Sequence, residues 1–228
     1  MFTAFLLLAL LALALVLVLI ILYKKSREKL LYQAPGDFEI HGVAGQSLEK
    51  AKMRIRKENR EKGLVGEHGI AEVLENLAEK YQLVVLHDLS VKNTKANIDH
   101  ILITDKVVYV IDAKNYTGIV KIGPDKDGKK VLKVGRYDQT KLAEKLKVYS
   151  EKVRESLEAA GIDVKVIPIL AFYKATFHKD SPALINGVTV NVHGIENELR
   201  RNAKSKLTGA HPSLIASKIL EEFPEKTV

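Results

Sequence analysis

The sequence predicts an α/β fold, with a mixed sheet flanked by helices, behind an N-terminal transmembrane helix. Three observations favour this class. Residues 164–173 are almost wholly apolar, which is typical of a strand buried on both faces by helices. Residues 98–104 and 107–115 have the composition of two hairpin strands, and residues 140–161 have the period of an amphipathic helix. Residues 2–22 carry no charge.

Composition sets the outer limits on function. The chain has 228 residues, enough for one ordinary domain with additional segments, and 46% of them are hydrophobic, enough for a sizeable core. The absence of cysteine excludes disulfides and cysteine-based zinc sites. The formal net charge of +8 favours anionic partners, either nucleic acid or an anionic membrane surface.

The apolar segment 2–22 has the length of a membrane span. About 21 residues at roughly 1.5 Å per residue extend roughly 30 Å, the thickness of the hydrocarbon core of a bilayer. No basic residue precedes the segment, which disfavours a signal peptide. Lys24, Lys25, Arg27 and Lys29 follow it. The positive-inside rule therefore predicts a single-pass protein of the cell membrane, anchored by residues 1–23, with its N-terminus outside and the rest cytoplasmic.

Residues 24–61 are expected to form a basic juxtamembrane linker and a charged helix. Pro35 and three glycines indicate a linker over residues 33–46, and a helix is expected from Ser47 to Gly63. Between Lys50 and Lys62, seven basic residues stand against two acidic ones. Two interpretations remain open: a solvated helix face, or contact with lipid headgroups or nucleic-acid phosphates.

The main domain is expected over residues 62–175. Its first helix carries apolar residues at helical spacing, Ile70, Val73, Leu74 and Leu77. The other expected elements are strands at 83–89, 98–104, 107–115, 118–122, 131–134 and 164–173, and a helix at 140–161 with Gly161 as its C-cap. Residues 176–228 add a peripheral strand at 187–192 and two helices, which pack on the domain or extend it.

The hairpin predicts a cluster of charges. With a two-residue loop at Asp105-Lys106, Asp99 falls directly opposite Asp112, and Lys114 shares their face of the sheet. Two facing carboxylates repel each other unless a positive charge lies between them. Lys114 supplies one such charge, and Mg²⁺, which binds one or two carboxylates together with water, is another. The alternative is a local Asp–Lys ion pair at a solvated strand end.

Glu67 is a third candidate. It shares a helical face with Ile70, Leu74 and Leu77, the face expected to pack on the sheet. A buried carboxylate needs a partner, which favours a polar cluster with Asp99 and Asp112. The alternative is an exposed carboxylate in the first helical turn, stabilised by the helix dipole.

These residues carry a resemblance to a known family. The Asp99 strand and Asp112-Ala113-Lys114 resemble the PD-(D/E)xK pattern of restriction-endonuclease-like folds. The ordered set G-x-x-G-E (63–67), IDH (98–100), VIDAKNYTG (110–118) and Gln139 resembles the NERD family, the nuclease-related domain, over residues 62–173. Two positions depart from the pattern: Ile98 replaces a proline, and Asp112 stands where glutamate is frequent.

The resemblance implies a restriction-endonuclease-like fold and a metal-dependent nuclease. Asp99 and Asp112 would hold Mg²⁺ or Mn²⁺ together with the backbone carbonyl of Ala113, and Glu67 would assist directly or through water. Lys114 would orient the attacking water or stabilise charge on the phosphate. Gln139 and Lys141 would bind substrate. Phosphodiester hydrolysis needs an activated nucleophile and neutralisation of developing charge, and a metal beside a lysine supplies both.

The expected partner is nucleic acid, DNA more than RNA. Residues 121–154 contain eleven basic and five acidic residues, and part of this stretch would face the phosphates or form a solvated helix face. The alternative function is a catalytically inactive nucleic-acid-binding or protein-interaction scaffold at the cytoplasmic face of the membrane. His100 falls on the opposite face of its strand from Asp99 and is expected in the core.

Overall fold

The computed structural model describes residues 15–19, 38–50, 56–180, 183–191, 195–202 and 210–226. The helices are α2 (Gln46–Lys50), α3 (Lys57–Tyr81), α4 (Thr140–Ala159), α5 (Ile195–Asn202) and α6 (Pro212–Glu222). The strands are β1 (Glu39–His41), β2 (Val84–Ser90), β3 (Asn97–Ile103), β4 (Val107–Lys114), β5 (Ile119–Pro124), β6 (Lys130–Val134), β7 (Tyr137–Asp138), β8 (Lys165–Phe172), β9 (Thr176–Phe177), β10 (Leu184–Ile185) and β11 (Val188–Asn191).

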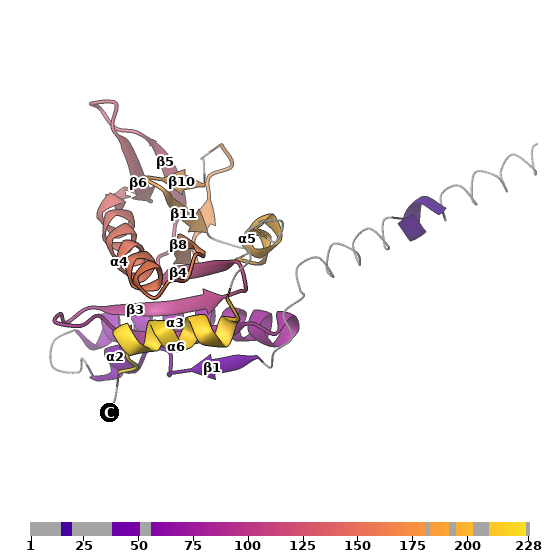
Figure 1. Ribbon diagram of the computed structural model, residues 1–228. Coiled ribbons are helices and arrows are strands. Elements are labelled where there is room, and N and C mark those ends of the chain that lie inside the picture. Colours follow the sequence, from indigo (N-terminus) through magenta and orange to yellow (C-terminus); the bar gives the residue numbers. More distant parts are fainter. Residues whose placement is uncertain are drawn as a thin grey trace, which may run out of the picture.

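The strands form two sheets in a mixed α/β fold (Figure 1). The larger sheet has seven strands in the order β1-β2-β3-β4-β8-β11-β10, and the smaller has four in the order β7-β6-β5-β9. In the larger sheet β4 is antiparallel to β3 and parallel to β8. The prediction of a mixed sheet flanked by helices is confirmed.

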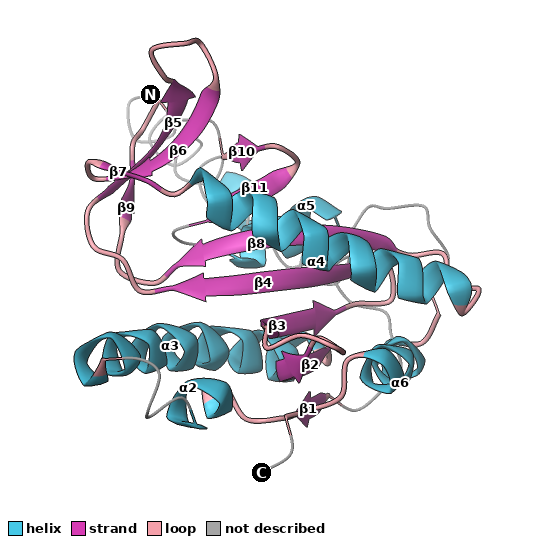
Figure 2. Ribbon diagram, turned by 90° about the vertical axis from the view of Figure 1, so that its left-hand side faces the viewer, coloured by secondary structure: helices cyan, strands magenta, loops and turns pink. Residues whose placement is uncertain are grey.

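Helices cover both faces of the larger sheet (Figure 2). Along β4, Val108 and Val110 belong to one apolar cluster with residues of α4 and α6. Tyr109 and Ile111 belong to a second cluster with residues of α3 and α5. Alternate side chains of a strand point to opposite faces, so a strand covered on both sides is apolar at consecutive positions.

The predicted membrane anchor lies outside the described residues, apart from a short helical stretch at 15–19. Among the residues that the structure describes, no helix combines the length and the apolar character that a membrane span requires.

The hairpin register agrees with the sequence prediction. The Thr104 backbone N–H donates to the Val107 carbonyl at 2.9 Å, which closes a two-residue loop at Asp105-Lys106. The ladder pairs run from Ile103↔Val108 to His100↔Ile111. A short loop determines the register because its length sets which residues face each other.

The predicted end of the charged helix at Gly63 is wrong, because α3 continues through this residue to Tyr81. Glycine inside a helix costs about 1 kcal/mol relative to alanine. Here Gly66 and Gly69 lie where a side chain would collide with another segment. A Cβ at Gly66 would lie 2.7 Å from the Asn115 Cβ, and one at Gly69 would lie 2.2 Å from the Tyr173 ring. Close packing of α3 therefore offsets the low helix propensity.

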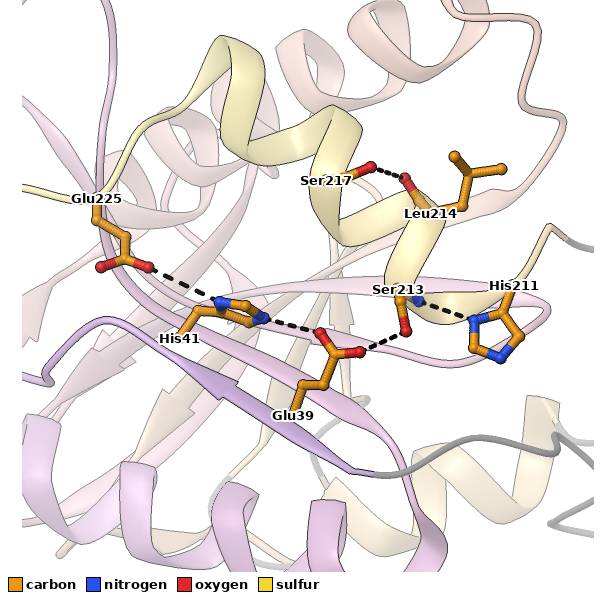
Figure 3. Close-up of polar contacts among 7 residues, drawn as sticks. All are labelled: Glu39, His41, His211, Ser213, Leu214, Ser217 and Glu225. Atoms are coloured by element: carbon orange, nitrogen blue, oxygen red, sulfur yellow. Dashed lines mark hydrogen bonds and ion pairs between the residues drawn. The ribbon is translucent and has the colours of Figure 1, made fainter.

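The predicted linker contains β1, which pairs in parallel with β2. A polar chain ties this strand to the C-terminal helix (Figure 3). The Ser213 hydroxyl donates to Glu39 Oε1 at 2.5 Å, and His41 Nε2 lies 2.9 Å from Glu39 Oε2. His41 Nδ1 lies 3.9 Å from Glu225 Oε1. The edge strand β1 of the larger sheet is thus joined by polar contacts to the C-terminal segment.

Candidate functional site

The candidate site begins where the β3–β4 ladder ends. Asp99 and Asp112 adjoin the last pair, His100↔Ile111, but the two aspartates that the sequence placed directly opposite each other do not form a ladder pair. Instead, Asp99 Oδ2 accepts a hydrogen bond of 2.9 Å from the Ala113 backbone N–H. The Asp99 residue is only 7% exposed. The Asp99 carboxylate therefore accepts, from the Ala113 backbone N–H, a hydrogen bond of the kind that a main-chain carbonyl accepts within the ladder.

Lys114 brings the candidate metal ligands to one point. Its Nζ lies 2.7 Å from Asp112 Oδ2 and 3.6 Å from Asp99 Oδ2. The same ammonium donates to the Ala113 carbonyl at 2.9 Å. These are the three groups that the family resemblance assigns to a metal ion. The lysine ammonium is thus a cation enclosed by two carboxylates and one carbonyl oxygen.

Glu67 adds a buried carboxyl group from α3. The residue is 6% exposed, and its Oε2 is buried without a hydrogen-bond partner among the described residues. Burial and, after it, the nearby charge of Asp99 raise the pKa of Glu67 from 4.5 to about 9. The carboxyl group of Glu67 is therefore protonated at neutral pH in this arrangement. The charges of Asp88 and Asp112 also raise the pKa of Glu67, and the charge of Lys114 lowers it.

Burial and charge also act on Asp99 and Lys114. Burial raises the pKa of Asp99 from 3.8 to about 7, although the charge of Lys114 opposes this rise. Burial works to lower the pKa of Lys114, but the attraction of Asp112 and Asp99 raises it above its ordinary value. Lys114 therefore stays charged and holds the carboxylates together in the absence of any other cation.

Asp88 is a fourth acidic residue at this site, which the sequence analysis did not select. It is 1% exposed and has a left-handed backbone with φ of 51°. Asn97 Nδ2 donates to Asp88 Oδ1 at 3.0 Å and lies 3.2 Å from Asp99 Oδ1. The Ser47 backbone N–H also donates to Asp88. The sequence did contain a signal for Asp88: it lies inside the apolar run LVVLHDL, and a carboxylate buried in such a strand needs polar partners.

The buried histidines lie outside this cluster. His87 Nδ1 and His100 Nδ1 are 2.8 Å apart, and both side chains are almost fully buried. His87 Nε2 lies 3.2 Å from Glu75 Oε1 at the surface. Burial lowers the pKa of His87 to about 4. The expectation that His100 belongs to the core is confirmed.

The groups around Lys114 offer oxygen donors to a metal ion. The described residues contain no group of three or more histidine, aspartate or glutamate side chains arranged around a metal position. They do provide two carboxylates and one main-chain carbonyl around the Lys114 ammonium. The Oε2 of Glu67 is a further buried oxygen without a hydrogen-bond partner among the described residues. These hard oxygen donors fit Mg²⁺ or Mn²⁺, which bind a few protein oxygens and retain several waters.

A cavity of about 490 Å³ opens beside the cluster. The described residues that line it come from α3, from the segments that follow β4 and β8, and from the region between β6 and α4. They are Lys62, Asn115, Tyr116, Thr117, Val134, Tyr137, Gln139 and Lys174. Gln139, one of the two predicted substrate-binding residues, is therefore at the cavity. Lys141, the other, is exposed on α4 and is not among the described lining residues.

Comparison with known proteins identifies the domain. No curated protein and no solved structure matches the chain significantly. Residues 62–173 match the family described as NERD, nuclease-related domain. The matched segment begins within α3, ends just after β8, and includes Glu67, Asp99, Asp112 and Lys114. Residues 62–173 are therefore a nuclease-related domain of the NERD family.

Proposed function

We propose that this domain is a divalent-metal-dependent nuclease that hydrolyses phosphodiester bonds of nucleic acid, DNA in preference to RNA. The observation that carries the proposal is the position of the Lys114 ammonium. It lies among Asp99, Asp112 and the Ala113 carbonyl, which together attract one cation. Membership of the nuclease-related family points to the same chemistry.

The residues have separable roles in this reaction. Asp99, Asp112 and the Ala113 carbonyl would hold Mg²⁺ or Mn²⁺, with Glu67 at hand once it has lost its proton. The bound metal ion would supply Lewis acidity, which activates water and neutralises charge on the phosphate. Lys114 would then no longer be needed to neutralise both carboxylates, and its ammonium would bind a phosphate oxygen at the edge of the cluster.

One observation favours the non-catalytic alternative. Lys114 compensates both carboxylates without any metal ion, as a structural ion-pair network would. In that case the domain would bind nucleic acid or a protein partner without cleaving it. The two functions assign different roles to Lys114. In the enzyme it would act on the phosphate, whereas in the scaffold it would only stabilise the fold.

Cleavage by the full chain in detergent tests the proposal. Labelled single-stranded and double-stranded DNA and RNA are incubated with Mg²⁺, Mn²⁺ or EDTA. We expect metal-dependent cutting that disappears in Lys114→Ala but persists in Lys92→Ala, an exposed lysine paired with Glu222. Cutting by Lys114→Ala at the parental rate would contradict the assigned role. No cutting of any substrate by folded parent protein would favour the scaffold.

We further propose that residues 2–22 anchor the protein in the cell membrane, with the nuclease-related domain in the cytoplasm. The support is the uncharged apolar sequence and the basic residues that follow it. Protease added outside intact cells should leave the domain undigested. Digestion of the domain before the cells are opened would exclude this topology.

A further inference from the structure

The cavity and the charged cluster are adjacent parts of one surface. Asn115, the residue that follows Lys114, lines the cavity. The Tyr173 backbone N–H donates to the Lys114 carbonyl at 2.9 Å, and Lys174, which follows Tyr173 in the chain, also lines the cavity. Figure 2 shows the arrowheads of β4 and β8 on the side that carries β7 and β9. The cavity thus lies at the carboxyl ends of two parallel strands, where α/β folds commonly bind ligands.

The charge of the cavity favours an anion. Among the described lining residues, two are lysines and none is acidic. Lys62 pairs with Glu58 at 2.6 Å, but an exposed pair of this kind is weak and exchanges partners readily. The α4 helix begins beside the cavity, next to Gln139, and has no acidic residue in its first turn. The Thr140 backbone N–H donates to Asp138 Oδ1 at 2.8 Å, so this carboxylate offsets the partial positive charge of the helix terminus and the two lysines carry the charge argument.

A second cavity of similar volume provides a contrast. It measures about 560 Å³ and lies between α4 and α6. Its three lysines, Lys92, Lys152 and Lys218, are matched by Glu155, Glu221 and Glu222. An acid-free basic lining is therefore a particular feature of the cavity beside Lys114 and does not follow from the basic composition of the chain.

The same cavity offers an aromatic surface. Tyr137 is 59% exposed, and the Arg136 guanidinium lies 5.1 Å from its ring centroid. Tyr116 packs against the buried ring of Phe172 at 6.0 Å between centroids. An exposed aromatic ring beside basic groups is the usual platform for an unstacked base, and such stacking contributes about 1–3 kcal/mol.

The remaining lining groups suit a nucleotide. Gln139 and Thr117 supply hydrogen-bonding side chains, and the Asn115 amide donates to the Lys62 carbonyl at 2.8 Å, which ties α3 to the segment after β4. Pockets for small ligands typically measure about 300–1,000 Å³, and one nucleotide fits within that range. A base reaches such a cavity only when it has left the duplex stack, which costs a few kcal/mol and costs least in a single strand.

We propose that this cavity binds one unpaired nucleotide of single-stranded nucleic acid, with its base on Tyr137 and its phosphate near Lys174, directly beside the cluster of Asp112 and Lys114. The identity of that neighbouring cluster as the cleavage centre rests on the proposed function. The binding site itself rests on the lining of the cavity. The substrate class is therefore single-stranded DNA or RNA, including frayed or single-stranded ends.

Binding is measured separately from cleavage. Fluorescence anisotropy of a labelled single-stranded oligothymidine and of a labelled duplex is recorded with the full chain in detergent and EDTA. We expect tighter binding of the single strand, and a rise in Kd of about tenfold in Tyr137→Leu. Tyr137→Phe should bind like the parent because it retains the ring. Lys174→Gln should weaken binding and reduce its salt dependence, whereas Lys152→Gln in the other cavity should change neither.

The outcomes separate this inference from the nuclease proposal. If the parent cleaves no substrate but Tyr137→Leu still weakens single-strand binding, the site stands and the nuclease proposal fails. If the parent cleaves and Tyr137→Leu binds and cuts like the parent, the nuclease stands and the site is overturned. Equal affinity for duplex and single strand, or equal losses in Lys152→Gln and Lys174→Gln, would also overturn the site.

Discussion

Lys114 Nζ lies 2.7 Å from Asp112 Oδ2, two residues earlier on the same strand, and reaches across to Asp99 at 3.6 Å. Alternation along β4 places both side chains on one face, and the end of the ladder lets Asp99 join them. The Lys114 ammonium thereby lies between the two carboxylates, at the position where a metal ion would bind them.

Removal of the ammonium should make the fold more dependent on metal. Lys114→Ala leaves buried carboxylates uncompensated, so without metal we expect a loss of unfolding free energy on the order of 3 kcal/mol. Added Mg²⁺ should stabilise this variant more than it stabilises the parent, because no ammonium competes for the ligands. Thermal unfolding with Mg²⁺ or EDTA measures both effects, with Lys92→Ala as the control. Equal metal responses in parent and variant would argue against a shared cation position.

Glu67 should make stability depend on pH when metal is absent. Its pKa in the folded protein, about 9, lies above the ordinary value of 4.5, so the folded state holds a proton that the unfolded state has lost. Stability is then fully present below about pH 4.5 and falls as pH rises towards 9, by at most about 1.4 kcal/mol per pH unit. Glu67→Gln should abolish the part of this decline above about pH 8, where Asp99, with a pKa of about 7, is already ionised.

Urea unfolding in EDTA at about pH 8 and about pH 9 checks this, because that interval lies well above the ordinary pKa of a histidine, about 6.5. The quantity to compare is the difference between parent and Glu67→Gln at each pH. A parental stability that stays level across the interval, or an identical decline in the variant, would show that Glu67 is not a buried neutral carboxyl group.

The glycines of α3 should differ in how they tolerate alanine. A Cβ at Gly66 would lie 2.7 Å from the Asn115 Cβ and 3.1 Å from its backbone nitrogen, neither of which can move freely. We expect Gly66→Ala to destabilise the fold by about 1–3 kcal/mol and to impair cleavage by shifting the segment after Lys114.

Gly63→Ala is the matched control. The added Cβ there would lie 2.7 Å from Leu48 Cδ1, the far end of a flexible side chain. Once Leu48 moves aside, the higher helix propensity of alanine should make the change neutral, or stabilising by up to about 1 kcal/mol. Urea unfolding compares the two variants, and equal effects would mean that the contact with Asn115 does not constrain α3.

The contact between Ser213 and Glu39 should matter for stability alone. Ser213→Ala removes the hydroxyl that donates to Glu39, and we expect a loss of about 1 kcal/mol with cleavage unchanged. The hydrogen bond from Ser213 and the contact with His41 hold the pKa of Glu39 below 4.5. Its stabilising effect is therefore present above about pH 4.5 and is lost as pH falls through the lower value of the folded state. A stability difference between parent and variant that persists unchanged at lower pH would contradict this origin.

Local patterns in the sequence were enough to predict the elements around the site. The apolar strands β4 and β8, the amphipathic helix α4 and the two-residue hairpin loop each follow from periodicity or turn length within a short window. Because side chains alternate along a strand, the hairpin register alone indicated that Asp99, Asp112 and Lys114 would gather. The membrane anchor at residues 2–22 stays a prediction of the same kind.

Other features were decided by contacts between segments far apart in the chain. The helix α3 continues through Gly63 although glycine usually favours a break, and Gly66 and Gly69 let it pack closely on Asn115 and Tyr173. The strand β1 is too short to show a period and exists because β2 pairs with it. The left-handed backbone at Asp88 is likewise invisible in the residue order.

The sequence by itself therefore determined which charged side chains gather at the end of the hairpin and on which strands they lie, because alternation and turn length act over a few residues. Only the tertiary structure decided that Glu67 is buried beside them, that Asp99 bonds the Ala113 N–H, and that Lys114 is enclosed by its neighbours. These contacts depend on how α3 packs on the sheet and on where the β3–β4 ladder ends. Both are determined by burial and close packing across the whole domain.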